Sequence, residues 1–323
     1  MKGFLLIVLF VAIGQYSWAV KKSTITATIK GFSGKEVYFD FIQQPDESRQ
    51  FAYVEGETIS FEAELQDITM LKINSWVWIC LKPGDSITVD LVYEGRNYKA
   101  AEFSGEEDVV KVNEALRDMR MARVKCRYKM DIDAAAVTLV PADKYHLMCM
   151  ERWKEEIGIL NTVKNYMPEK MYNFLLSEHE SIYLGNFITY PYLWASFSRK
   201  VLADILPKDY WTVLDNYNVR GDKGSLHSSA YMGFLLPYAD YVRKRELVKA
   251  GKSWEGSLSL RDGFDYLTEF YDKNLLDAAL CVYLHEAAAK GEDFDVIDEL
   301  VNVYLKKYNK NKEYKKMLLE VMQ

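Results

Sequence analysis

The spacing of apolar residues changes once along this chain, and that change limits the possible folds more than any other feature. Over residues 23–104 apolar and polar residues alternate with a period of two, most strictly at 59–65. Such alternation is typical of strands that bury one face. From Glu106 onward apolar residues recur at helical spacing, as at Val109 and Val112. This period predicts amphipathic helices, and the two halves together predict an α+β protein.

Turn residues separate the expected strands at 31–34, 55–56, 83–85 and 94–95. Several short strands at this spacing predict an antiparallel β-sandwich or barrel-like module. The chain has 323 residues, more than one hydrophobic core usually serves, so two domains are expected. We place the β-domain at 20–105 and an all-α domain of helical hairpins at 106–323.

Several local signals mark helix ends in the second half. Asp293 precedes an apolar stripe that begins at Phe294, which predicts an N-cap, and Gly251 is expected as a helix C-cap. Pro237 is expected to kink or break a helix over 228–249. The loop at 218–228 is rich in glycine and serine and predicts a possible sub-boundary within the helical domain.

The first nineteen residues have the pattern of a secretory signal peptide. Lys2 is followed by an apolar run at 4–13 and by a cleavage site that ends at Ala19. The apolar run is shorter than the roughly 20 residues of a transmembrane helix, and no later segment is long enough. No cysteine follows the cleavage site, so a lipoprotein anchor is not expected. The prediction is a periplasmic or otherwise extracytoplasmic protein.

The charge balance argues against a nucleic-acid partner. The formal net charge is −6 at pH 7, and an acidic chain offers no electrostatic footprint for nucleic acid or for an anionic membrane surface. We expect a protein partner or an extracellular ligand instead.

Four segments of the β-domain, 25–31, 35–39, 56–61 and 81–89, follow a familiar order. They resemble the β-domain of unknown function that precedes thioredoxin-like domains of the TlpA and AhpC/TSA type in secreted proteins of Bacteroidetes-type bacteria. The resemblance covers about a quarter of the chain and implies location and architecture. The family's redox chemistry depends on a thioredoxin-like domain that we do not expect in this chain, and the sequence contains no Cys-x-x-Cys, so no catalytic residue is transferred.

Two short motifs each lack a residue that the corresponding functional motif requires. Gly251-Lys252-Ser253 looks like the end of a phosphate-binding loop, but Glu246 stands where that loop needs glycine. His285-Glu286 begins a zincin-like motif, but Ala289 replaces the second histidine. The sequence therefore predicts no catalytic residue, no cofactor and no metal ligand.

The cysteines allow two interpretations. Cys126 lies among basic residues that would favour its thiolate, or it pairs with Cys149 on the next predicted helix as a possible disulfide. Cys80 and Cys281 have apolar neighbours and are expected to be buried.

Aromatic density is high around Pro191, where Tyr190, Tyr192 and Trp194 lie close together. Exposed aromatic rings would suit a ligand or partner surface. The helical spacing of Tyr183, Phe187 and Tyr190 favours helix packing instead.

These patterns predict a non-catalytic, secreted periplasmic accessory or binding protein. One alternative is a truncated or divergent thiol-disulfide oxidoreductase of the TlpA or AhpC/TSA type. A second is a glycan-handling protein that uses the aromatic segment near Trp194.

Overall fold

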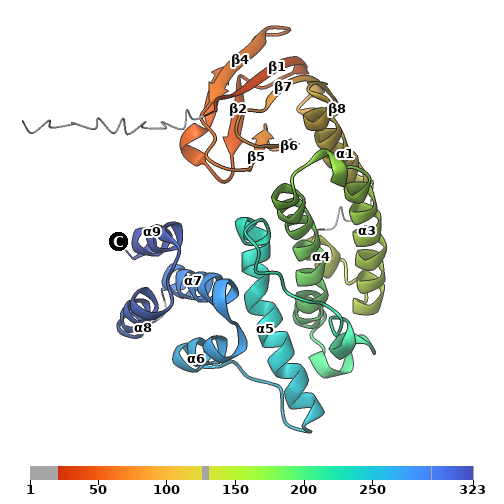
Figure 1. Cartoon of the computed structure of the whole chain (residues 1–323). Helices are drawn as coiled ribbons and strands as arrows, with labels where there is room; N and C mark the ends of the chain where they lie inside the picture. Colours follow the sequence, from red (N-terminus) through yellow and green to blue (C-terminus); the bar gives the residue numbers. More distant parts are fainter. Residues whose placement is uncertain (1–20, 126–130, 292, 323) are drawn as a thin grey trace, which may run out of the picture. The chain divides into compact units, whose positions relative to one another are not determined.

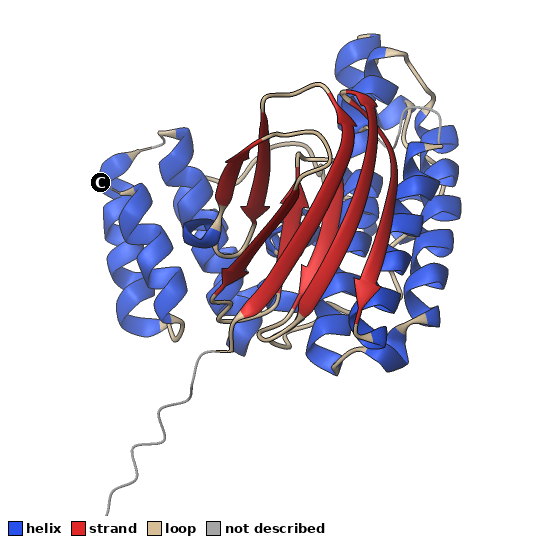
Figure 2. Ribbon diagram, turned by 90° about the horizontal axis from the view of Figure 1, so that it is seen from above, coloured by secondary structure: helices blue, strands red, loops and turns tan. Residues whose placement is uncertain are grey.

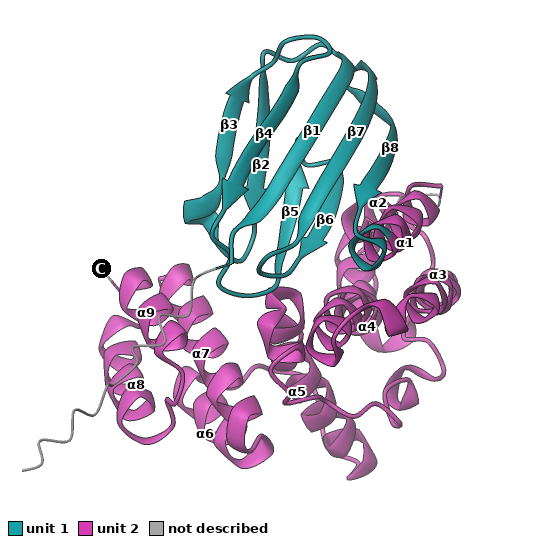
Figure 3. Cartoon of the chain, turned by 45° about the horizontal axis from the view of Figure 1, so that its top comes forward, with its two compact units in different colours: residues 1–110 teal, residues 111–323 magenta. Residues whose placement is uncertain are grey.

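The computed structural model describes residues 21–125, 131–291 and 293–322. The chain divides into two compact units, residues 1–110 and 111–323 (Figure 3). The predicted signal peptide at 1–19 lies outside the described residues and stays a prediction.

The N-terminal unit contains two four-stranded sheets (Figure 1). The first has the order β4-β1-β7-β8, formed by Thr58–Ala63, Ser23–Phe32, Ser86–Gly95 and Asn97–Gly105. The second has the order β3-β2-β5-β6, formed by Arg49–Ala52, Glu36–Phe41, Thr69–Ile73 and Val77–Leu81. Every strand among the described residues (red in Figure 2) belongs to this unit.

The strand pairing differs from the prediction at one place. All neighbouring strands pair antiparallel except β1 and β7, which run parallel, with Ile25 opposite Ile87 and Ala27 opposite Val89. The expected all-antiparallel module is therefore wrong at this pair. The physical reason is the route of the chain, because β2, β3, β5 and β6 form the second sheet before β7 returns beside β1.

One apolar cluster fills the β unit. Alternate residues of both sheets contribute to it, including Ile25, Phe39, Ile79 and Val89. The alternation in the sequence predicts these inward faces, because successive strand side chains point to opposite sides.

Helices form the second unit, and α1 begins just before its boundary. In chain order they are α1 Glu107–Val124, α2 Ile132–Val137, α3 Ala142–Thr162, α4 Glu169–Ser198, α5 Ser229–Lys249, α6 Leu260–Phe270, α7 Lys273–Lys290, α8 Phe294–Lys307 and α9 Lys312–Val321. Helix α4 packs against α3 and α5, and α7 packs against α5, α6, α8 and α9 (Figure 1). The prediction of an α+β chain with strands first and helices afterwards is confirmed.

Two prolines lie inside helices that continue past them. Pro191 lies in α4 and Pro237 lies in α5, so Pro237 does not break its helix. Pro191 has no N–H to donate to the carbonyl of Phe187. One residue further along, the hydroxyl of Tyr210 donates to the carbonyl of Ile188 at 3.0 Å, so a side chain supplements the backbone bonding at this point.

The predicted helix ends are confirmed at both tested residues. The side chain of Asp293 accepts from the N–H of Val296 and caps α8. Gly251 has a positive φ of 66° just after α5, and its N–H donates to the carbonyl of Val248 at 3.0 Å. Within the described part of the chain, none of the helices is both long enough and apolar enough to cross a membrane.

Candidate ligand-binding cavity

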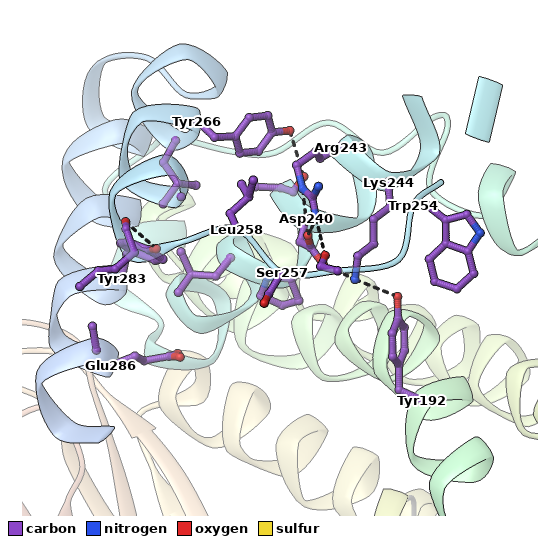
Figure 4. Close-up of a pocket in the computed structure, with 18 of the residues that line it drawn as sticks. Tyr192, Asp240, Arg243, Lys244, Trp254, Ser257, Leu258, Tyr266, Tyr283 and Glu286 are labelled. Atoms are coloured by element: carbon purple, nitrogen blue, oxygen red, sulfur yellow. Dashed lines mark hydrogen bonds and ion pairs between the residues drawn. The ribbon is translucent and has the colours of Figure 1, made fainter. Parts of the chain in front are cut away.

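The helical unit contains a cavity of about 710 Å³ (Figure 4). Its walls come from α4, α5, α6, α7 and the loop 250–259 between α5 and α6. Aromatic rings and ionisable groups share the lining with aliphatic side chains. The aromatic members are Tyr192, Trp254, Tyr266 and Tyr283, and the ionisable members are Asp240, Arg243, Lys244, Glu255, Glu286 and Lys290.

A network of ion pairs on α5 forms one side of the cavity. Asp240 lies 2.7 Å from Nη2 of Arg243 and 2.7 Å from Nζ of Lys244. The pairs form because residues three and four apart lie on the same helix face. Nζ of Lys244 also donates to the hydroxyl of Tyr192 on α4 at 3.2 Å. These contacts fix the positions of both cations.

The ion-pair network changes the pKa of Lys244. Burial alone would lower the pKa of its ammonium, but the hydrogen bonds to Asp240 and Tyr192 outweigh burial and raise the pKa above its ordinary value. Lys244 is therefore fully charged at neutral pH and stays paired with Asp240.

Tyrosine hydroxyls hold the helices of the cavity together. The hydroxyl of Tyr266 on α6 donates to the carbonyl of Ala239 on α5 at 3.1 Å. The hydroxyl of Tyr283 on α7 donates to the carbonyl of Leu260 on α6 at 2.9 Å. Because both hydroxyls are already engaged, these two residues present mainly their rings to the cavity.

The loop 250–259 is attached at several points. Arg243 donates to the carbonyl of Gly256 at 3.3 Å, and the ring of Trp254 meets Trp211 at a centroid distance of 5.3 Å in a T-shaped arrangement. At its end, the hydroxyl of Ser259 accepts from the N–H of Asp262 and caps α6. The loop is thus a defined wall of the cavity.

The second charged pair of the cavity lies on α7. Lys290 is 3.0 Å from Glu286, four residues earlier. In Figure 4, Tyr283 and Glu286 lie on the opposite side of the view from Trp254 and Tyr192, with Ser257 between them. The lining contains three acidic and three basic side chains, so its formal charge is zero.

The three aromatic residues of the possible ligand or partner surface have different surroundings. Tyr190 is buried, stacks on Tyr145 at a centroid distance of 3.8 Å and donates to the carbonyl of Val140 at 2.7 Å. Trp194 is also buried, with Nζ of Lys200 5.1 Å from its ring. Of the three, only Tyr192 lines the cavity.

The other polar and aromatic residues of the cavity carry no distinctive signal in the sequence. Asp240, Arg243 and Lys244 have the spacing of an exposed helical ion-pair ladder, which occurs on many helix surfaces. Trp254 stands in a short loop and gives no periodic signal. Only their position opposite α6 and α7 makes them a site.

The described cysteines are buried. Cys149 and Cys281 lie in the helical core and Cys80 lies in the β unit. Burial raises the pKa of the Cys281 thiol to about 12, so this thiol stays protonated at neutral pH. Cys126 lies outside the described residues, so its pairing with Cys149 stays a prediction.

A separate buried ionic cluster joins α1, α3 and α4. The carboxylate of Glu156 is inaccessible to solvent and accepts from Nε of Arg123 at 3.0 Å. It also accepts from the hydroxyl of Tyr183 and lies 3.4 Å from Nδ1 of His179. Burial would raise the pKa of Glu156, but hydrogen bonds from His179 and Arg123 outweigh it and lower the pKa to about 2. This cluster fixes three helices together.

Within the described residues, no three His, Cys, Asp or Glu side chains gather in an arrangement that could hold a metal ion. Comparisons with protein-family models, with curated proteins and with solved structures found no match.

Proposed function

We propose that this chain is a non-catalytic, extracytoplasmic binding protein that holds a small ligand in the cavity between α4, α5, α6 and α7. The observation that carries the proposal is the cavity itself, which combines aromatic walls with fixed polar groups. Its volume of about 710 Å³ falls within the range of roughly 300–1,000 Å³ typical of ligand pockets.

The remaining parts of the proposal come from the sequence. The predicted signal peptide supports export, and the resemblance of the β-module supports an accessory role beside thioredoxin-like proteins. In this proposal the N-terminal unit is a β-sandwich-like domain and the helical unit is the ligand-binding domain.

The alternative of a thiol-disulfide oxidoreductase has less support. Such an enzyme needs an accessible thiolate, whereas Cys80, Cys149 and Cys281 are buried. Insulin reduction that disappears on Cys126→Ser would favour this alternative.

A cavity-blocking variant tests the binding proposal. Ser257 is exposed and lines the cavity, whereas Ser253 is exposed in the same loop and does not line it. Ser257→Trp should obstruct the cavity, and Ser253→Trp is the matched control. We expect ligand-observed NMR with a mixed panel of oligosaccharides and short peptides to show binding to the unmodified chain and to the control. Binding should be lost in Ser257→Trp.

Two results would contradict the proposal. One is that the unmodified chain binds no member of the panel. The other is that Ser257→Trp binds as well as the control, because the ligand would then lie elsewhere.

A further inference from the structure

We infer that the ligand of this cavity is a neutral saccharide, an inference that rests on the proposed function. Four properties of the lining lead to this class of ligand: its zero net charge, its paired ionic groups, its aromatic walls and its helical construction.

The charge balance argues against a charged ligand. The single carboxylate of Asp240 is shared by Arg243 and Lys244, and Lys290 is paired with Glu286. Glu255 balances the remaining positive charge of the lining. An anionic ligand would have to compete with Asp240 for its cations and would leave a carboxylate without a partner. Because removing one partner from a partly buried charge pair is costly, a neutral ligand fits better.

The polar groups also argue against a purely apolar ligand. A hydrocarbon would displace water from six ionisable side chains and would offer no hydrogen bond in return. A hydroxyl group both donates and accepts. The hydroxyls of a sugar can therefore donate to Asp240 or Glu286 and accept from Lys244 while the existing ion pairs remain.

The aromatic walls of the cavity suit the apolar C–H face of a sugar ring. In Figure 4, Trp254 lies to the right of Lys244 and Tyr192 lies below it, and all three line the cavity. Rings with an apolar body next to polar groups bind ligands that have both kinds of surface. A sugar ring is such a ligand, because its C–H groups form apolar patches and its hydroxyls project from the rim.

A peptide ligand fits these walls less well. Strand addition to a sheet edge is one recurring mode of peptide recognition, and it is not available in a cavity that is lined by helices and one loop. The hydroxyls of Tyr266 and Tyr283 already donate to backbone carbonyls of the protein.

The experiment compares ligand classes by isothermal titration calorimetry on the full mature chain. The probes are neutral oligosaccharides, oligosaccharides with sulfate or uronic-acid groups, and short peptides. We expect binding of a neutral member whose Kd changes less than about twofold between about 0.1 M and 1 M salt, because salt screens interactions between net charges.

Two substitutions test whether the sugar binds in the cavity. Trp254→Ala should weaken binding roughly tenfold or more, with Trp76→Ala in the β unit as the control for loss of a partly exposed tryptophan. Glu286→Gln keeps the shape of the side chain but removes the carboxylate, and should weaken binding roughly threefold. Its control is Glu320→Gln, since Glu320 forms a similar pair with Lys316 on α9. Should Trp254→Ala reduce stability, Glu286→Gln still reports on binding, because the Glu286 side chain is 43% exposed and the substitution keeps its shape.

The outcomes separate this inference from the binding proposal. Binding of a peptide or of an acidic oligosaccharide that Ser257→Trp abolishes would overturn the saccharide inference and leave the cavity as a binding site. Binding of a neutral sugar that neither Trp254→Ala nor Ser257→Trp alters would overturn the placement. Absence of binding to every probe would overturn both.

Discussion

The two units of this protein fill their cores with different chemistry. The β unit is packed mainly with aliphatic and phenylalanine side chains, with Tyr93 as the buried tyrosine of its cluster. Phe39 and Phe61, for example, meet edge to face at a centroid distance of 5.0 Å. In the helical unit the largest fully buried side chains are mostly tyrosines. These are Tyr145, Tyr183, Tyr190, Tyr231, Tyr241 and Tyr304.

The difference follows from how each unit satisfies its backbone. In a sheet, neighbouring strands pair most of the N–H and C=O groups. Helix ends and connections leave carbonyls without such partners. A tyrosine hydroxyl reaches one of them in the helical unit, since Tyr241 donates to the carbonyl of Tyr210, between α4 and α5, at 2.6 Å. Tyrosines also donate to carbonyls inside helices, as Tyr271 does to Leu235 in α5 at 2.8 Å. The β core is therefore stabilised mainly by the packing of apolar side chains, and the helical core also by hydrogen bonds from tyrosine hydroxyls.

The largest expected effect comes from the buried ionic cluster of the helical unit. Glu156→Ala should lower the free energy of unfolding by roughly 3–5 kcal/mol, because it leaves Arg123 and His179 without their carboxylate. Urea unfolding followed by far-UV circular dichroism measures the loss. The neighbouring Glu155→Ala is the control, and it should cost less than about 1 kcal/mol because the pair of Glu155 with Arg152 is exposed.

The same cluster predicts a dependence on pH. The pKa of Glu156 is lowered in the folded chain from 4.5 to about 2. Its contribution is therefore complete above about pH 4.5 and is lost as the pH falls toward 2. The difference in unfolding free energy between the unmodified chain and Glu156→Ala should shrink over this window. A difference that stays constant across it would show that the carboxylate charge does not stabilise the cluster.

A reciprocal exchange of one hydroxyl tests the comparison between the two cores. Tyr190→Phe in the helical unit should cost roughly 1–3 kcal/mol, because the carbonyl of Val140 loses its buried donor. Phe39→Tyr in the β unit should cost a similar amount for the opposite reason, since it places a hydroxyl in an apolar cluster. Urea unfolding of both variants gives the two values.

Tyr166→Phe is the control for this exchange, because Tyr166 is 38% exposed, and it should change stability by less than about 0.5 kcal/mol. If Phe39→Tyr were as stable as the unmodified chain, the β core would accept polar groups and the distinction between the units would fail.

The sequence predicts the parts of the fold that depend on periodicity or on local caps. Alternation at 59–65 indicates the inward residues of β4, and Asp293 and Gly251 act as the sequence indicates because caps depend on neighbouring residues only. The parallel pairing of β1 with β7 could not be predicted in this way, since it depends on contacts between segments about sixty residues apart.

The cavity could not be predicted from the sequence for the same reason, because its residues lie far apart along the chain. Tyr192 belongs to the possible aromatic surface of the sequence analysis, but its hydrogen-bond partner Lys244 is 52 residues away in the sequence. The chain has seven tryptophans, and nothing local in the sequence distinguishes Trp254 from the others. A site whose residues come from separate helices has no characteristic residue spacing in the sequence.

The smallest expected effect concerns two exposed glycines, one in each unit, with no atom within 4 Å of where a Cβ would lie. Gly56, in the turn between β3 and β4, has a φ of 74°, so Gly56→Ala should cost roughly 1 kcal/mol in backbone strain. Gly158 lies inside α3, where alanine is the better helix former, so Gly158→Ala should gain up to about 1 kcal/mol. Urea unfolding of both variants should give opposite signs. Equal signs would mean that backbone conformation does not determine where this chain tolerates a side chain, because neither substitution meets a neighbouring atom.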